Sequence, residues 1–331
     1  MRYDVSGIGN PLVDILTHVD EDFLEEHNLH KGVMHLIDIN QKRSLLNSLK
    51  THSADLITEI GGSCPNTMTT LSKLGARTSL AGKIGNDELG RIFEDKIQQK
   101  NVASFLKTGE LDTGTSIILI TPDGERTMNT YLGACQEFSP DDLSEKMIKH
   151  SKYFYFTGYM WDTDPQKAAT MKAIDIAKRN NVKVVFDLAD PFAVNRYKVD
   201  FLSLLKKHID ITLANAEEAK ILTGLPPDKA AAEIGKFCNT TVIKNGADET
   251  YISNNNELYI IESFKTQVVD TTGAGDNFAA GFLFGLLQGL SLENCGKVAS
   301  FVALKCIEKI GAHAPDNILE LVLNRFDFIR L

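Results

Sequence analysis

A run of small residues that leads into an apolar helix limits the folds open to this chain. The run reads Asp270-Thr271-Thr272-Gly273-Ala274-Gly275-Asp276 and follows the β-branched segment Thr266–Val269. Apolar side chains then recur every four positions, which predicts a buried helix, at Phe278, Phe282, Leu286 and Leu290. Small residues at a helix start let another group approach the backbone closely. Because the N–H groups there form the positive end of the helix, the run predicts an anion site.

Asp276 places a carboxylate beside this anion site, and two interpretations are open. Aspartate is common at helix starts, so Asp276 is either a helix cap or a base. As a base, it would take the proton from a substrate hydroxyl held between its carboxylate and the amides of Gly273, Ala274 and Gly275. Phosphoryl transfer depends mainly on positioning and charge stabilisation, so these few groups suffice for it. The run therefore predicts a phosphotransferase site.

Length and charge restrict the class of protein and its partners. The chain has 331 residues, 43% of them hydrophobic and 24% charged, which is typical of a globular protein of one or two domains. The net charge of −9 argues against a nucleic-acid partner but leaves room for an anionic nucleotide at a locally positive site. The sequence shows neither a signal peptide nor a membrane span, so we expect a cytoplasmic protein without a membrane partner.

The distribution of cysteine and histidine does not predict a metal site. The five cysteines are scattered, which favours reduced, buried thiols over a disulfide framework or a zinc site. The eight histidines are also scattered, and we interpret them as solvated surface residues. The motifs of P-loop kinases and protein kinases do not occur in the sequence.

Strands and helices alternate along most of the chain. Strands are predicted at residues 3–7, 78–82, 153–157, 182–187, 209–214 and 241–244, and helices at 88–99, 164–179 and 216–223. This alternation is typical of an α/β fold with a mostly parallel sheet and helices on both faces. Pro11 follows Gly7-Ile8-Gly9 and blocks the helix that a dinucleotide-binding fold would start there. Asn10 and Asp14 are expected in the turn after the first strand, as ligand contacts or as an Asx turn with a surface aspartate.

A hairpin and a pair of glycines predict a lid with a hinge. Residues 115–121 alternate with period two, 122–125 form a turn, and 126–131 return as a second strand. With parts of residues 12–60, this hairpin is expected to form a small sheet over the site. Gly61 and Gly62 are the expected hinge. The large domain is predicted to comprise residues 1–11, 61–111 and 133–331, and the lid residues 12–60 and 112–132.

Several polar residues near these elements have both a functional and a structural interpretation. Ser63 is expected to cap the helix that follows the hinge, and Asn66 projects from its first turn. Arg126 reaches an anion across the cleft, or is an ordinary exposed arginine. Asn215 and Glu218 have the spacing of a capping box, which is the preferred interpretation of that pair alone.

Together these motifs resemble the PfkB/ribokinase family of carbohydrate and nucleoside kinases. The resemblance covers nearly the whole chain, at residues 7–14, 61–66, 113–126, 215–218 and 270–276. It implies a ribokinase-like fold, a lid made of a small β-sheet, and ATP and Mg²⁺ as donor and cofactor. Within the family the chain looks most similar to adenosine kinases, because it has the same residues as those enzymes at Gly9-Asn10-Pro11-Leu12 before Asp14 and at Gly62-Ser63 before Asn66.

The resemblance also implies roles for individual residues. Asp14 would hold the ribose hydroxyls, assisted by Gly62 and Asn66, and Tyr159 would lie against the base. Arg126 would bind the transferred phosphate. The remaining expectations are an acceptor side that includes Asn10 and Ser63, a nucleotide side that includes Asn215, Lys244, Gly246, Thr272 and Gly275, Mg²⁺ held through water by Asn215 and Glu218, and a possible K⁺ at Asp270 and Thr272.

Three functions follow from these observations. The first is an ATP-dependent kinase of the 5′-hydroxyl of a purine nucleoside, adenosine above all. The second is a sugar kinase of the same fold, acting on ribose, fructose or a related acceptor. Met34 and Cys64-Pro65 depart from the usual adenosine kinase pattern and leave this alternative open. The third is a sensor of nucleotides or sugars without catalysis, which has no need of Asp276 as a base. The sequence is compatible with a monomer or a homodimer.

Overall fold

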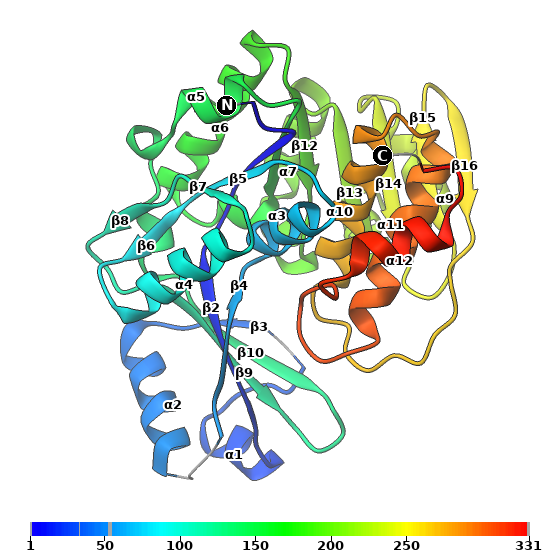
Figure 1. Cartoon of the computed structure of the whole chain (residues 1–331). Helices are drawn as coiled ribbons and strands as arrows, with labels where there is room; N and C mark the ends of the chain where they lie inside the picture. The colour runs from blue at the N-terminus through cyan, green and yellow to red at the C-terminus, as the bar shows by residue number, and fades with distance from the viewer. Residues whose placement is uncertain (1, 33, 52–54, 330–331) are drawn as a thin grey trace.

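The computed structural model describes residues 2–32, 34–51 and 55–329. Within these residues the strands form a nine-stranded sheet, a five-stranded sheet and a two-stranded sheet (Figure 1). The expected α/β class, with a large and mostly parallel sheet flanked by helices and a separate small sheet, is confirmed. The exact domain boundaries stay a prediction.

The large sheet is parallel over most of its width, in the order β16-β15-β14-β13-β12-β11-β1-β5-β7. The strands from β14 to β7 run parallel, and β15 and β16 add an antiparallel hairpin at one edge. Strand order reverses beside β1, which is where open α/β sheets bind ligands. The strands are β1 (Val5–Ile8), β5 (Thr78–Ala81), β7 (Ala103–Ser104), β11 (Tyr153–Thr157), β12 (Lys183–Asp187), β13 (Ile211–Asn215), β14 (Thr240–Lys244), β15 (Thr250–Asn254) and β16 (Glu257–Ile261).

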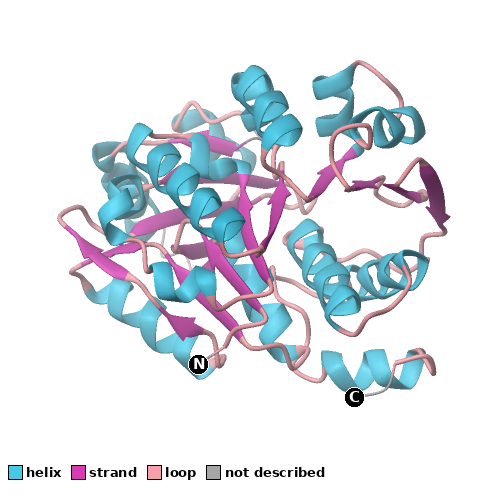
Figure 2. Ribbon diagram, turned by 90° about the horizontal axis from the view of Figure 1, so that it is seen from above, coloured by secondary structure: helices cyan, strands magenta, loops and turns pink. Residues whose placement is uncertain are grey.

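Helices cover both faces of this sheet (Figure 2). Successive side chains of a strand point to opposite faces, so Tyr155 joins one apolar core while Phe154 and Phe156 join the other. The first core is closed by α3 (Ser63–Lys73), α4 (Glu88–Gln99), α10 (Ala274–Leu287), α11 (Leu292–Ile307) and α12 (Ile318–Arg325). The second is closed by α5 (Glu145–Lys149), α6 (Asp164–Arg179), α7 (Pro191–Lys207), α8 (Ala216–Thr223) and α9 (Pro227–Ile234).

The predicted buried helix after Asp276 is α10, and it packs closely on α11. Glycines make this approach possible: a Cβ atom on Gly281 would lie 2.7 Å from Ala299 Cα, and one on Gly285 would lie 2.9 Å from Cys295 Cα. Because α10 begins at the anion-site loop, this contact fixes the direction in which its first turn points.

The small sheet has the order β3-β10-β9-β2-β4 and contains the predicted hairpin. Its strands are β2 (Leu12–His18), β3 (Met34–Leu36), β4 (Ile57–Gly61), β9 (Gly114–Ile120) and β10 (Arg126–Tyr131). Two helices, α1 (Glu21–Glu26) and α2 (Ile39–Thr51), cover its outer face through Phe23, Leu45 and Leu49, which pack on Ile117 and Leu119. Further short elements are β6 (Lys83–Gly85), β8 (Lys107–Gly109) and the 3₁₀ helices η1 (Gly133–Glu137), η2 (Pro140–Asp142) and η3 (Gly158–Trp161).

Two local predictions were wrong. Asp14 lies in strand β2 and not in a turn, because the chain passes at Pro11 directly from the large sheet into the small one. Ser63 does not cap α3, since the N-cap residue is Gly62, at φ +94°, and Ser63 is the first residue of the helix. The β-branched segment Thr266–Val269, for which no strand was predicted, lies outside the strands, and both of its valines are more than half exposed.

Other predictions about the class of protein have mixed outcomes. All five cysteines are buried and free, as expected. His313 is half-buried and bonded to the backbone, so the interpretation of all histidines as solvated was wrong. Every helix in the described part of the chain is too short or too polar to cross a membrane.

We predict that Gly281→Val destabilises the protein by about 2 kcal/mol, because its side chain would overlap the backbone of α11. Lys297→Val, which places the same side chain on a position of α11 that is 42% exposed, is the matched control. Denaturant unfolding of both variants measures the difference. Equal stabilities would contradict the close packing of the two helices.

Candidate active site

A cavity of about 630 Å³ lies between the small sheet and the carboxyl ends of β1, β11 and β12. It brings together many of the residues that the sequence predicted: Asn10, Asp14, Gly62, Ser63, Asn66, Arg126, Tyr159, Asp270, Thr272, Gly273, Ala274, Gly275 and Asp276. The predicted residues Asn215, Glu218, Lys244 and Gly246 lie outside its lining. The small sheet therefore covers one half of the predicted site, while the other half follows the edge of the large sheet.

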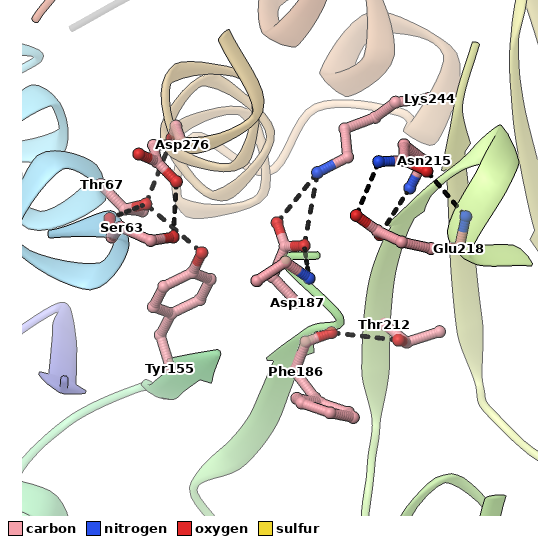
Figure 3. A network of polar contacts seen from close by, with 11 residues as sticks. Ser63, Thr67, Tyr155, Phe186, Asp187, Thr212, Asn215, Glu218, Lys244 and Asp276 are labelled. Carbon is pink, nitrogen blue, oxygen red and sulfur yellow. Dashed lines mark hydrogen bonds and ion pairs between the residues drawn. The ribbon is translucent and has the colours of Figure 1, made fainter. Parts of the chain in front are cut away.

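The carboxylate of Asp276, the third residue of α10, receives two side-chain hydrogen bonds from α3, and Figure 3 shows the one from Ser63. Ser63 Oγ donates to one carboxylate oxygen at 2.6 Å, and Asn66 Nδ2 donates to the other at 2.9 Å. The N-cap position of α10 belongs to Gly273, and no side chain caps it. The carboxylate of Asp276 therefore points to α3 and the cavity instead of capping its own helix.

Burial raises the pKa values of Asp276 and Asp14, two of the aspartates that line the cavity. It raises the pKa of Asp276 to about 6, although the hydrogen bonds from Ser63 and Asn66 act in the opposite direction. Burial also raises the pKa of Asp14 to about 7, with Arg126 opposing the shift and Asp276 adding to it. A carboxyl group with a pKa near neutrality is suited to exchange a proton with a substrate.

The loop before α10 is held in a conformation that favours glycine. Gly273 has φ +73°, and a Cβ atom there would lie 2.4 Å from Ala312 O. Asn277 Nδ2 donates to Gly273 O and to Ala312 O, each at 2.8 Å. The amide of Ala274 is used within the loop, since it donates to Thr271 O at 3.2 Å. The amides of the first turn of a helix lack acceptors within the helix, so this end of α10 is suited to bind an anion.

Asp14 projects from the lid through the register of the small sheet. Asp14 pairs with Ser116 on β9 and with Glu59 on β4. A Cβ atom on Gly61 would lie 2.1 Å from Asp14 Oδ2, so glycine at this position makes room for the carboxylate. Ser116 in turn shares a hydrogen bond of 3.3 Å with Thr130. Asp14 thus belongs to a polar row on the face of the lid that looks into the cavity.

Arg126 connects the lid with the loop before α10. Its guanidinium lies 2.5 Å from Asp270 Oδ2 and donates to Thr272 Oγ1 at 2.8 Å. Asp270 also accepts from the backbone amides of Thr272 and Gly311. Arg126 therefore reaches across the cleft, as expected, and the anion that it contacts is the carboxylate of Asp270. The K⁺ site at Asp270 and Thr272 stays a prediction, at a place where Arg126 already supplies positive charge.

A row of buried polar groups continues along the carboxyl edge of the large sheet (Figure 3). Lys244 Nζ lies 3.0 Å from Asp187 Oδ2 and 3.3 Å from the position of a Cβ atom on Gly275. Asn215 and Glu218 form the capping box of α8. Burial raises the pKa of Glu218 to about 7, while Lys244 opposes the shift. The described residues contain no cluster of three or more acidic, histidine or cysteine side chains that would hold a metal by itself.

Two further predicted residues lie at the floor of the cavity. Tyr159 lies in η3, and its hydroxyl donates to Asp190 at 3.4 Å. Asn10 is buried, and its side-chain oxygen accepts from Gln166 Nε2 at 2.7 Å. Both side chains are held by neighbours in the large domain, so this wall of the cavity is preformed.

Sequence reasoning missed Asp187 and Asn277. Asp187 is 2% exposed and ends β12, so the rule that drew attention to Asn10 after the first strand would also have found it. Asn277 follows Asp276 in α10 and is fully buried, and it also accepts from Thr70 Oγ1 at 2.8 Å. A polar residue in an otherwise apolar helix was the available signal for Asn277.

Comparison with known proteins shows the family. Residues 33–318 match the model of the pfkB family of carbohydrate kinases. An uncharacterised sugar kinase of Archaeoglobus fulgidus is 32% identical over 73% of this chain and 96% of its own length. A 5-dehydro-2-deoxygluconokinase of Bacillus subtilis is 28% identical over 76% of this chain and 81% of its own length.

Solved structures agree with this assignment. An adenosine kinase from Sinorhizobium meliloti aligns with a TM-score of 0.90 and 35% identity, over 98% of this chain and all of that one. A probable sugar kinase from Rhizobium etli aligns with a TM-score of 0.90 and 34% identity, over 98% of each chain. The chain therefore belongs to the PfkB family of carbohydrate kinases.

Proposed function

We propose that this protein is an ATP-dependent kinase that transfers the γ-phosphate to the 5′-hydroxyl of a purine nucleoside, namely adenosine. The observation that carries the proposal is Asp276, a carboxylate with a raised pKa at the amino end of α10, inside the cavity under the lid. A base next to an anion site is the arrangement that hydroxyl phosphorylation needs. A sensor would have no use for a base with a perturbed pKa.

In this mechanism Asp276 accepts the proton of the acceptor hydroxyl as the oxygen attacks the γ-phosphate. Ser63 and Asn66 hold the carboxylate in place through their hydrogen bonds. The amides at the start of α10 stabilise the charge that develops on the phosphate. The small sheet excludes water by closing at Gly61 and Gly62, which limits hydrolysis of ATP.

Kinases of this family use ATP and Mg²⁺, and the residues beside the cavity fit the metal. Asp187, Glu218 and Asp276 are three carboxylates near a single buried ammonium group, Lys244. Mg²⁺ commonly keeps several waters and binds phosphates with one or two carboxylates, so a dedicated protein cage is not needed. When bound, Mg²⁺ offsets the charge of the phosphates. We propose that Asn215 and Glu218 hold it through water.

The side chains on the cavity face of the lid favour a nucleoside as the acceptor. Strand pairing places two rows on its cavity face: Met34, Met128 and Ile118 form an apolar row, and Leu36, Thr130, Ser116 and Asp14 form a more polar one. The polar row suits the hydroxyls of a ribose, and the apolar row suits a planar base against Tyr159.

Charge in the cavity argues against an acidic sugar as the acceptor. Among the described residues, the cavity is lined by one cationic side chain, Arg126, and by six acidic ones: Asp14, Asp123, Glu125, Asp162, Asp270 and Asp276. Arg126 is already paired with Asp270. A gluconate derivative, such as the B. subtilis relative's name implies, carries a carboxylate that would be repelled here. A neutral sugar remains the second candidate.

Measuring kinase activity on a panel of acceptors tests this proposal. ADP release is measured with ATP, Mg²⁺ and, in turn, adenosine, inosine, guanosine, ribose, fructose and gluconate. We expect the highest kcat/KM with adenosine and none above background with gluconate. Turnover on a neutral sugar alone would support the kinase activity and refute a nucleoside as the acceptor.

Asp276→Asn is expected to lower kcat by about 10³-fold, the loss typical of removing a general base, while the affinity for ATP changes little. Asp164→Asn makes the same substitution at a carboxylate that is 98% exposed and serves as the control. Single-turnover kinetics and nucleotide titration measure the two effects. An Asp276→Asn variant with the turnover of the unmodified protein would exclude Asp276 as the base.

The pH dependence of kcat/KM follows from the raised pKa values of Asp276 and Asp14, about 6 and about 7. A carboxyl with a raised pKa keeps its proton to higher pH, and both groups act here in their ionised form, Asp276 as the base and Asp14 as a hydrogen-bond acceptor for ribose hydroxyls. We therefore expect kcat/KM to rise from pH 5 and to level off near about pH 8. In Asp14→Asn the ionisation near 7 should disappear. A profile that is flat down to pH 5 would contradict this assignment.

A further inference from the structure

The lid strand next to the hinge is attached to the large domain at its open edge. Strand β4 pairs with β2 on one side and is an edge of the small sheet. Along its length, Thr58 O accepts from Lys96 Nζ at 3.0 Å, and Ile60 O accepts from His313 Nε2 at 2.9 Å. Two alternate carbonyls of this edge are thus held by side chains from outside the lid, one from α4 and one from the loop between α11 and α12.

His313 lies in the loop that also supports the anion site. Its neighbours Ala312 and Ala314 both bind the side chain of Asn277: Ala312 O accepts from Nδ2 at 2.8 Å, and Ala314 N donates to Oδ1 at 3.1 Å. Asn277 Nδ2 also donates to Gly273 O. Three hydrogen bonds therefore join Ile60, just before the hinge, to the backbone of Gly273 at the start of α10: Ile60 to His313, the adjacent Ala312 to Asn277, and Asn277 to Gly273.

The protonation of His313 is set by these contacts. A backbone carbonyl can only accept, so Nε2 carries the proton that is donated to Ile60 O. Nδ1 is buried and has no partner among the described residues. Burial lowers the pKa of His313 to about 4, and Lys100, Lys73 and Lys309 act in the same direction. The imidazole is therefore neutral, and its one N–H is committed to the hinge strand.

We propose that His313 is a positioning residue that couples the lid hinge to the anion-site loop, so that movement of the lid strand alters the position of the amides at the start of α10. The proposal rests on the proposed function, because it concerns the geometry of phosphoryl transfer. Lys96 also holds β4, but it does so from α4 and not from the loop between α11 and α12. It therefore serves as a control for an anchor of β4 that lies outside the chain of contacts to the anion-site loop.

Hydrogen exchange without any ligand tests the coupling independently of catalysis. In His313→Leu we expect the amides of residues 57–61 and of residues 270–277 to exchange faster than in the unmodified protein, by about tenfold. In Lys96→Met only residues 57–61 should change. His313→Gln retains an N–H donor and should restore slow exchange in both segments. If His313→Leu does not fold, His313→Asn, with a shorter side chain than Gln, takes its place.

Kinetics on the best acceptor provide the second measurement. We expect His313→Leu to lower kcat by about tenfold, His313→Gln to recover most of it, and Lys96→Met to stay within about twofold. Faster exchange at residues 57–61 alone, with kcat unchanged in His313→Leu, would overturn the proposal and leave His313 as an edge anchor. A protein that is inactive on every acceptor would refute the proposed function, while the exchange data would still decide the coupling.

Discussion

The hydrogen bonds between Asp276 and the first turn of α3 are the interaction on which the site depends. A carboxylate that is removed from water needs donors, and Ser63 and Asn66 supply them. These donors lie directly after Gly62, whose positive φ turns the chain from the lid strand into α3. The donors to Asp276 and the proposed hinge are therefore close together in the chain, so that a movement at Gly62 would alter the hydrogen bonds of Asp276.

Charge balance sets a second condition on the site. Arg126, which contacts Thr272, and Lys244, which lies beside Gly275, are both paired, with Asp270 and with Asp187. Both pairs are largely buried, so separating either of them leaves a costly uncompensated charge. A triphosphate that enters must therefore bring its own counter-charge or exchange partners with these pairs. This requirement agrees with a donor bound together with Mg²⁺.

The sequence predicted the structural features that depend on residues close together in the chain, and it missed contacts between residues far apart in the chain. The run from Asp270 to Asp276 and the capping box at Asn215 are local, so their patterns were informative. Ser63 was interpreted as a cap because its actual partner, Asp276, lies 213 positions away. Strand β2 was missed because its two pairing partners, β4 and β9, come much later in the chain. His313 likewise acquires its role through Ile60, a contact that local composition does not indicate.

Strand register decides which side chains of the small sheet face the cavity. Met34 is opposite Met128, which is opposite Ile118, and two positions further along, Thr130 and Ser116 lead to Asp14. A shift of one residue in any of these pairings would turn the side chains to the outer face, where α1 and α2 pack. The two rows over the cavity, and with them the acceptor that we propose, therefore depend on the register of the small sheet.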